Sequence, residues 1–303
     1  MIDADRKLHD RARFGFLLMT AGLLFYAVSD AFIKHLMSMY SVKQTMFLRA
    51  VTRLVPLVIA MYCQGGIRRV LGTSCPGRHL IRLGVNFAYT CAFMCAMPKG
   101  SLTMIYTVSY TAPFFMVILS ALILKEKITP ERWIAVAIGM IGVLIAMRPG
   151  SSVFEMAAFF VLAGAFLGAL NKILMRRLAE TEHSLSIAIY PNLTMIVVIL
   201  PLLIPAWEPM PWSHWSLFAF VGCITAFGQY MIAQALRFTQ ASLLAPIDYS
   251  TFFWVFALDL FWWDKGPNVY TLVGAIVIVS SNLYILYCTK RDQVKKVMSS
   301  SVE

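Results

Sequence analysis

Charged residues are scarce in this chain. Of its 303 residues only 14% are charged and 59% are hydrophobic, and the mean hydropathy is +0.73. A soluble domain of this length carries roughly a quarter charged residues. One or two soluble domains are therefore excluded, because most of their helices would need polar faces that this sequence lacks.

The chain also lacks the signatures of several enzyme classes. It has no GxSxG, HExxH, P-loop or protein-kinase motif, so an ATP-driven pump is excluded for this chain alone. Its six cysteines form neither a CxxC pair nor a Cys/His ligand pattern, so the sequence predicts no metal site and no cofactor. The five histidines lie in expected loops or helix ends, and none has a matched carboxylate motif.

Acidic residues are few as well. The chain has 15 Asp and Glu against 26 Lys and Arg, which gives a net charge of +11. The basic residues lie in short runs between apolar stretches, as the positive-inside rule of membrane proteins produces. This distribution argues against a nucleic-acid partner and for a lipid bilayer.

Apolar segments long enough to cross a bilayer recur along the whole chain, since a spanning helix needs ~20 mostly apolar residues. Ten are expected, at 14–37, 44–63, 80–97, 102–124, 132–148, 153–174, 185–206, 214–236, 243–263 and 269–288. If the N-terminus lies inside, nineteen of the 26 Lys and Arg fall in connections on that side and five on the other. This bias predicts an inner (plasma) membrane protein with both termini in the cytoplasm and an uncleaved first helix.

The two halves of the chain are similar to each other. Residues 109–115 resemble residues 248–254 at an offset of 139, and Ala21-Gly22 matches Ala163-Gly164 at an offset of 142. A five-helix unit crosses the membrane an odd number of times, so a second copy must be inverted. We therefore predict an all-α integral membrane protein of ten transmembrane helices in two inverted five-helix repeats, 12–148 and 153–289. Such repeats around a midplane site are a recurring design of secondary transporters.

Several motifs resemble those of a known family. They are Ser29-Asp30 followed by Lys34, Arg49 early in the second helix, the Pro98-Lys99-Gly100 link, and residues 126–133 (EKITPERW) followed by an apolar run through Gly139 and Gly142. Over roughly residues 12–289 the chain resembles the drug/metabolite transporter superfamily, specifically its ten-helix EamA-type members. It departs from the pattern at Phe252, where the family has a proline, and at residues 264–267. Its rhythm is most similar to that of the bacterial S-adenosylmethionine carriers.

Ionisable side chains at membrane depth are the first candidates for binding a cargo, because each costs ~2.5 kcal/mol or more unless it faces a cavity or a partner. Asp30 contacts a substrate or pairs with Lys34, four residues on. Arg49 and Arg53 snorkel to the interface, face a water-filled cavity or pair with a carboxylate such as Asp30. With the uncharged candidates, the predicted substrate-binding set is Asp30, Arg49, Arg53, Asn86, Tyr106, Tyr110, Asn171, Gln229, Asp248, Tyr249 and Trp254.

Two further features leave alternatives open. Asp248 binds a cation, carries a proton or pairs with Lys172, whereas Asp259 is expected to be solvated near the outer interface. A stripe of Thr and Tyr side chains on the fourth helix either lines a cavity or forms interhelical hydrogen bonds, and we favour the cavity. The stripe consists of Thr103, Tyr106, Thr107, Tyr110 and Thr111. Gly164 and Gly168 are expected to allow close helix packing.

The sequence thus predicts a secondary transporter that moves a small organic metabolite by alternating access, by exchange or with ion coupling. Acidic and basic residues at membrane depth suit a zwitterionic cargo with an aromatic part, such as S-adenosylmethionine or an aromatic amino acid. The alternatives are an intramembrane enzyme that transfers a lipid or acyl group, and a channel. A monomer is compatible with these features, and no oligomeric state is predicted.

Overall fold

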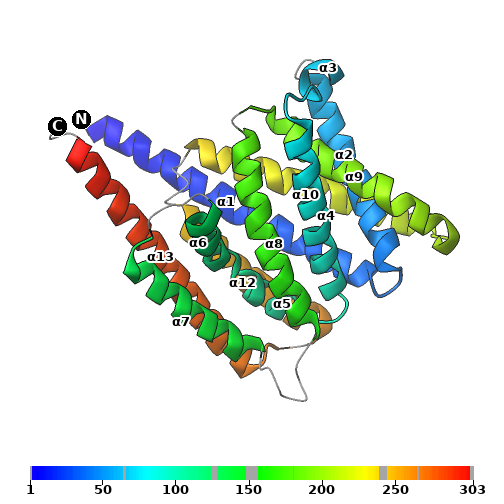
Figure 1. Cartoon of the computed structure of the whole chain (residues 1–303). Coiled ribbons are helices and arrows are strands. Elements are labelled where there is room, and N and C mark those ends of the chain that lie inside the picture. The colour runs from blue at the N-terminus through cyan, green and yellow to red at the C-terminus, as the bar shows by residue number, and fades with distance from the viewer. Residues whose placement is uncertain are drawn as a thin grey trace.

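The computed structural model describes residues 2–63, 66–123, 128–147, 156–179, 181–238, 244–264 and 266–300, and within these ranges every regular element is helical (Figure 1). The helices of the first half are α1 (Ile2–Leu36), α2 (Val42–Cys63), α3 (Ile67–Val70), α4 (Pro76–Ala96), α5 (Leu102–Ser109), α6 (Ala112–Ile123) and α7 (Pro130–Met147). Those of the second half are α8 (Met156–Ala179), α9 (Ser184–Leu203), α10 (Trp212–Phe238), α12 (Ser250–Trp263) and α13 (Val269–Ser300), with 3₁₀ turns η1 (Ile204–Ala206) and η2 (Ala245–Tyr249).

The all-α membrane fold is confirmed. Within the described ranges, eight helical segments are long and apolar enough to cross a membrane, α5 and α6 forming one of them. The two remaining crossings are α4, whose first turns carry Arg78, His79 and Arg82, and the short α12 that follows η2. The charges of α4 lower its hydropathy, and α12 has only 14 residues. Hydropathy and length alone therefore single out eight segments rather than ten.

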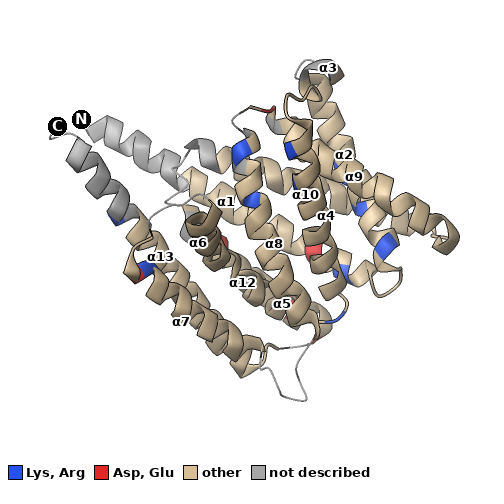
Figure 2. Ribbon diagram, viewed as in Figure 1, with Lys and Arg blue, Asp and Glu red and all other residues tan. Residues whose placement is uncertain are grey.

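The outer surface of the bundle is apolar, as a bilayer requires. Large hydrophobic side chains such as Leu17, Ile59 and Phe261 point outwards and are exposed. Figure 2 shows long stretches of helix without a charged residue. Because backbone polar groups are paired inside each helix, such a surface can face lipid at little cost.

The packing of the helices follows the internal repeat. In chain order α1, α2, α4, α5–α6 and α7 correspond to α8, α9, α10, η2–α12 and α13. The helix pairs that pack most extensively are α1 with α10, α4 with α8, α2 with α9 and α7 with α13. When each helix is replaced by its counterpart in the other repeat, the pair α1–α10 becomes the pair α8–α4. The pairs α2–α9 and α7–α13 stay the same. The ten crossings are thus arranged as two inverted five-helix repeats.

Glycines lie at the corresponding crossings of the two halves. A Cβ at Gly22 on α1 would lie 2.7 Å from Ile232 Cγ1 on α10, so only glycine allows this approach. Gly164, 142 positions later, lies at the crossing of α8 with α4, where a Cβ would be 3.6 Å from Ala92 Cβ. At Gly168 a Cβ would lie 3.1 Å from the Tyr89 ring of α4, so the predicted close packing is confirmed at Gly168, while Gly164 makes ordinary contacts.

The fourth helix of each repeat is interrupted, whereas one continuous helix was expected in each place. Expected span 102–124 is divided into α5 and α6 at Tyr110, and expected span 243–263 contains a 3₁₀ turn that ends at Tyr249. These tyrosines are 139 positions apart, and their rings meet edge to face with centroids 5.1 Å apart. The Asn282 side-chain amide of α13 donates to the Tyr110 carbonyl at 2.8 Å and satisfies an acceptor that the interruption leaves free.

Candidate functional site

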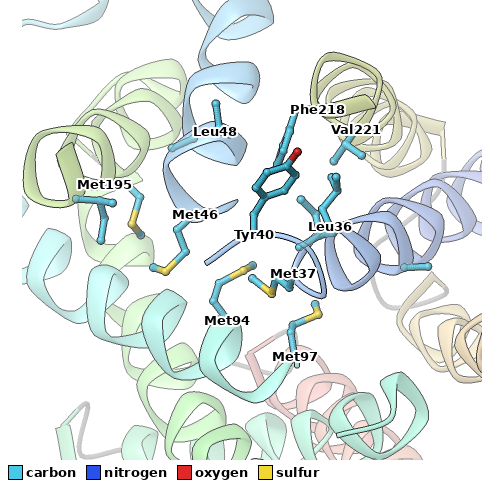
Figure 3. Close-up of a cluster of buried hydrophobic side chains, with 14 of the residues drawn as sticks. Leu36, Met37, Tyr40, Met46, Leu48, Met94, Met97, Met195, Phe218 and Val221 are labelled. Atoms are coloured by element: carbon cyan, nitrogen blue, oxygen red, sulfur yellow. The ribbon is translucent and has the colours of Figure 1, made fainter. Parts of the chain in front are cut away.

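A cavity of about 190 Å³ lies where α2, α4 and α9 meet inside the membrane-spanning part of the bundle. Its lining consists of Met46, Arg49, Ala50 and Arg53 from α2, Asn86, Tyr89, Thr90 and Met94 from α4, and Pro191, Asn192 and Met195 from α9. Figure 3 shows the thioether side chains of Met46, Met94 and Met195 reaching from three helices into one region. The cavity therefore combines two cations, several polar groups and soft apolar side chains.

The two repeats contribute different chemistry to this cavity. Helices α2 and α9 begin at Val42 and Ser184, 142 positions apart, and they pack along each other. The same offset places Pro191 opposite Arg49 in the alignment and Met195 opposite Arg53. One wall of the cavity is thus cationic, while the repeat-related wall carries a proline and a thioether.

Arg49 is held in an ion pair inside the bundle. Its Nη2 atom lies 2.5 Å from Asp30 Oδ1, and the Tyr106 hydroxyl donates to Asp30 Oδ2 at 2.8 Å. Asp30 is 4% exposed and Arg49 is 7% exposed. Buried charges persist at membrane depth when they are paired and hydrogen-bonded, so the charges of these two residues cancel. Asp30 therefore pairs with Arg49, and not with Lys34 on its own helix.

Arg53, one helical turn further on, stands outside this ion pair. In the described ranges no carboxylate lies within ion-pair distance of it, and its Nε atom has no hydrogen-bond partner. Asn86, Tyr89 and Asn192 add amide and hydroxyl groups around it. The cavity thus carries one net positive charge together with neutral donors.

The expectation that Asp259 is solvated is wrong. This residue is 1% exposed, and its carboxylate accepts hydrogen bonds from the backbone N–H groups of Leu102 at 3.1 Å and Thr103 at 2.6 Å. Lys34 lies 3.6 Å away and also stacks over the ring of Trp263. Because free N–H groups and the helix dipole at the start of α5 attract an anion, Asp259 caps α5 and joins it to α1 and α12.

The polar stripe on the fourth helix does not line the cavity. Thr103 donates to Asp259, whereas Thr107 and Thr111 donate to carbonyl groups of their own helical segment. All three threonines are buried, so the cavity interpretation is wrong for them and the hydrogen-bonding alternative holds. Tyr106 instead reaches Asp30, and the ring of Tyr110 meets the ring of Tyr249 edge to face.

The remaining predicted residues lie outside the cavity lining. Asn171 is buried on α8, Gln229 is exposed on α10, and Asp248 is exposed in η2, where no ion pair with the exposed Lys172 is formed. Trp254 of α12 is half-buried in the apolar cluster that also contains Tyr106. Of the predicted set, Arg49, Arg53 and Asn86 line the cavity, and Asp30 and Tyr106 hold Arg49 in place.

Several residues that line the cavity were not in the predicted substrate-binding set, although the sequence contains signals that indicate them. On α4, Asn86, Tyr89, Thr90 and Met94 are spaced by three, one and four residues, so they share one face of the helix with the predicted Asn86. Met195 could have been found from the repeat, since it corresponds to Arg53. His79 Nε2 lies 3.5 Å from Glu182 Oε2, a contact between residues 103 positions apart that no sequence motif marks.

Comparison with known proteins places this geometry in a family. The model of the EamA-like transporter family matches the chain twice, over residues 13–148 and 155–287. An S-adenosylmethionine uptake transporter of Rickettsia prowazekii is 24% identical over 229 residues, which are 76% of this chain and 78% of the relative. A riboflavin transporter of Vibrio cholerae is 26% identical over 285 residues, 91% of this chain and 94% of the relative.

A solved crystal structure is similar in fold, with a TM-score of 0.58 and 17% identity over 91% of this chain and 97% of the other. The matched family and the named relatives are transporters of small molecules, so the chain is a membrane transporter and not an enzyme. Since the family model covers nearly the whole chain in two successive copies, this protein belongs to the EamA-like transporter family.

Proposed function

We propose that this protein is a secondary transporter that carries a small organic metabolite through the cavity between α2, α4 and α9 by alternating access. Residues 12–148 and 153–289 form the two units that rock against each other, as inverted repeats do in other carriers. The protein lies in the inner (plasma) membrane with both termini in the cytoplasm. The excess of Lys and Arg on one side of the ten crossings supports this orientation.

The observation that carries the proposal is Arg53, which lines a cavity at membrane depth without an ion pair of its own among the described residues. A lone guanidinium there is costly, and a cation at this depth marks a cavity or a pathway for a solute. A guanidinium binds carboxylate and phosphate groups strongly, in bidentate geometry. We therefore expect the cargo to carry an anionic group that Arg53 binds.

The rest of the cavity indicates the other part of the cargo. Met46, Met94 and Met195 offer polarizable thioethers, and Tyr89 offers an aromatic ring. Methionine surfaces adapt to ligands of different shape and contact aromatic rings favourably. The cargo is thus an amino-acid-like or nucleoside conjugate with a planar ring. Of the cargoes named for relatives, S-adenosylmethionine carries a carboxylate and riboflavin does not, so Arg53 favours the former.

The size of the cavity supports a moving structure. Its volume of about 190 Å³ is below the roughly 300–1,000 Å³ of sites that hold ligands of this kind. The cavity must therefore widen when the cargo enters, which alternating access provides. Transport proceeds by exchange or by coupling to an ion, and Asp30 and Asp248 are the carboxylates available for a proton.

Uptake into proteoliposomes tests the proposal. Labelled S-adenosylmethionine, riboflavin and an aromatic amino acid are offered, with and without the same unlabelled compound inside. We expect saturable uptake of an anionic or zwitterionic cargo that the internal compound stimulates. Arg53→Gln lowers this uptake roughly 10- to 100-fold at low cargo concentration, since a hydrogen bond to a charged group is worth about 1.5–3 kcal/mol.

Two controls make the test specific. Arg53→Lys retains the charge and is expected to keep part of the uptake, while Arg78→Gln removes an exposed arginine outside the cavity and is expected to keep all of it. Uptake by Arg53→Gln at the parental rate would contradict the assignment of Arg53. Single-channel currents in place of saturable uptake would contradict the carrier itself.

A further inference from the structure

Two histidines lie in the first turns of α4 and α10, which are the corresponding third long helices of the two repeats. Helix α4 begins in the sequence Pro76-Gly77-Arg78-His79, and Pro211-Trp212-Ser213-His214 begins α10, the corresponding helix of the second repeat. Both stretches are Pro-x-x-His at the first turn of the third long helix of a repeat. Because the repeats are inverted, these two helices start from opposite faces of the membrane. The histidines therefore lie at opposite ends of the bundle.

His79 joins the repeats at the end of the bundle where α1 begins, because two crossings, α1 and α2, precede α4. The C-terminal end of α13 lies at the same end, since the ten crossings are even in number. Its Nε2 atom is 3.5 Å from Glu182 Oε2 in the turn before α9, and its ring packs edge to face on Tyr190 of α9, with centroids 5.0 Å apart. Glu182 also accepts hydrogen bonds from the Ser74 N–H at 2.9 Å and the Thr73 hydroxyl at 3.0 Å. These contacts fasten the start of α4 to the start of α9, and we call them the His79 latch.

His214 joins the repeats at the other end. Its Nδ1 atom is hydrogen-bonded to the hydroxyl of Tyr40 in the turn between α1 and α2, and the two rings meet at 83°. Beside this pair, the side-chain amide of Gln44 exchanges two hydrogen bonds with the backbone of Glu208, at 2.8 and 3.0 Å. These contacts fasten the start of α2 to the segment before α10, and we call them the His214 latch.

The partners of the two histidines correspond as well. Tyr40 and Glu182 are 142 positions apart, the offset that also relates Gly22 to Gly164 and the starts of α2 and α9. In each latch, a histidine at the start of a third helix thus contacts the residue just before the second helix of the other repeat. The two latches are therefore similar in placement and lie at opposite ends of the bundle. Their chemistry differs, because one contains a carboxylate and the other a phenol.

Each latch joins two helices, and three of the four helices that are joined line the cavity. The His79 latch ties α4 to α9, and the His214 latch ties α2 to α10, while α2, α4 and α9 line the cavity. We infer that the two latches are the gates of the transport cycle. The His79 latch opens the cavity towards the face that holds the chain termini, and the His214 latch opens it towards the opposite face. This inference rests on the proposed function, since it assigns the gates of the same cavity.

The two gates differ in their dependence on charge. Burial opposes ionisation of Glu182, but the hydrogen bonds from Ser74 and Thr73 and the contact with His79 outweigh it and hold the pKa of Glu182 below its usual value. A depressed pKa stabilises the latch above the ordinary value of ~4.3, and this contribution is lost only as the pH falls through the lower, folded-state pKa. The carboxylate of the His79 latch therefore stays charged at physiological pH, so movement of the repeats must break the contact.

Access of a reagent to a cysteine in the cavity tests the two gates separately. Thr90→Cys provides the cysteine in a chain whose six native cysteines are replaced. A membrane-impermeant thiol reagent is applied to right-side-out and to inside-out vesicles. We expect Glu182→Gln to raise the labelling rate about fivefold from the face of the chain termini only, as loss of one ordinary hydrogen bond shifts an equilibrium. Tyr40→Phe is expected to raise it by a similar factor from the opposite face only.

The control and the contrary outcomes follow from the same geometry. Ser216→Ala removes a hydrogen bond within the first turn of α10 that joins no other segment, so it should change neither rate. His79→Gln repeats the test where Glu182→Gln does not yield folded protein by gel filtration. Unchanged labelling, or an equal rise from both faces, in a folded latch variant would overturn the inference even where uptake is confirmed. Side-specific labelling without uptake of any metabolite would leave the gates standing and overturn the proposed cargo.

Discussion

The pairs α7–α13 and α2–α9 each consist of one helix and its counterpart in the other repeat. The two pairs differ in how closely their helices pack. In the pair of α7 and α13, glycines let the backbones touch: a Cβ at Gly274 would lie 2.6 Å from the carbonyl oxygen of Gly142. In the pair of α2 and α9, arginine and methionine side chains hold the helices around a cavity. The same position in the repeat scheme thus serves as a close-packed joint in one place and as a binding site in the other.

The difference indicates which parts of the protein can move. A backbone contact without intervening side chains has a single good geometry, since packed interiors do not deform continuously. A cavity wall of long methionine and arginine side chains has many geometries of similar energy. We therefore expect α7 and α13 to stay together during transport, while α2 and α9 separate around the cargo.

The largest effect on stability is expected at the ion pair of Asp30 and Arg49, beside the cavity of α2 and α9. Asp30→Ala leaves the guanidinium of Arg49 buried without its carboxylate, which costs about 3–5 kcal/mol of stability. Thermal unfolding of the purified protein in detergent measures this as a large drop in Tm. Asp30→Ala combined with Arg49→Met removes both charges and is expected to recover most of the loss. A double variant that is as unstable as Asp30→Ala alone would show that the ion pair is not the cause.

The same charged pair shows how far the sequence predicts this protein. Hydropathy and the distribution of Lys and Arg suffice for the all-α membrane fold, because burial in lipid acts on each span separately. The sequence left two partners open for Asp30, Lys34 by spacing along α1 and an arginine of α2, and could not decide between them. That choice depends on which helices pack together: α2 brings Arg49 to Asp30, and α12 brings Asp259 to Lys34.

The interruptions of the fourth helices were missed for a similar reason. Pro113 follows Tyr110 by three residues and Pro246 precedes Tyr249 by three, so a local helix-breaking signal is present, but it does not say whether the helix bends, ends or starts there. The groups that stabilise the break, Asn282 and the facing tyrosine ring, come from other parts of the chain. The cavity was predictable only in part, because Arg53 and Asn86 are conspicuous at membrane depth, whereas a lining methionine looks like any other apolar residue of a span.

A smaller loss of stability is expected at the α7–α13 joint. Gly274→Ala places a Cβ 2.6 Å from both Ala146 Cβ and the Gly142 carbonyl oxygen, and backbone atoms cannot move aside as a side chain would. Overpacking of this kind costs about 1–3 kcal/mol, which a fall in Tm would show. Gly164→Ala is the matched control, because its Cβ would meet only ordinary contacts, the nearest at 3.6 Å. Equal effects of the two substitutions would remove the argument that α7 and α13 form the rigid joint.

The smallest effect on stability is expected at Asn282 of α13, which supports the break between α5 and α6. Asn282 of α13 donates to the Tyr110 carbonyl between α5 and α6 in a partly buried hydrogen bond, so Asn282→Ala costs about 0.5–1.5 kcal/mol. Since the interruption lies where the two repeats meet at Tyr110 and Tyr249, the loss should appear chiefly as faster local opening of α5 and α6. Hydrogen exchange measured by mass spectrometry detects this as faster exchange in residues 102–123 than in α2 and α9. Faster exchange in α2 and α9 instead would mean that the joint and the cavity are not separate units, and the contrast between the two helix pairs would fail.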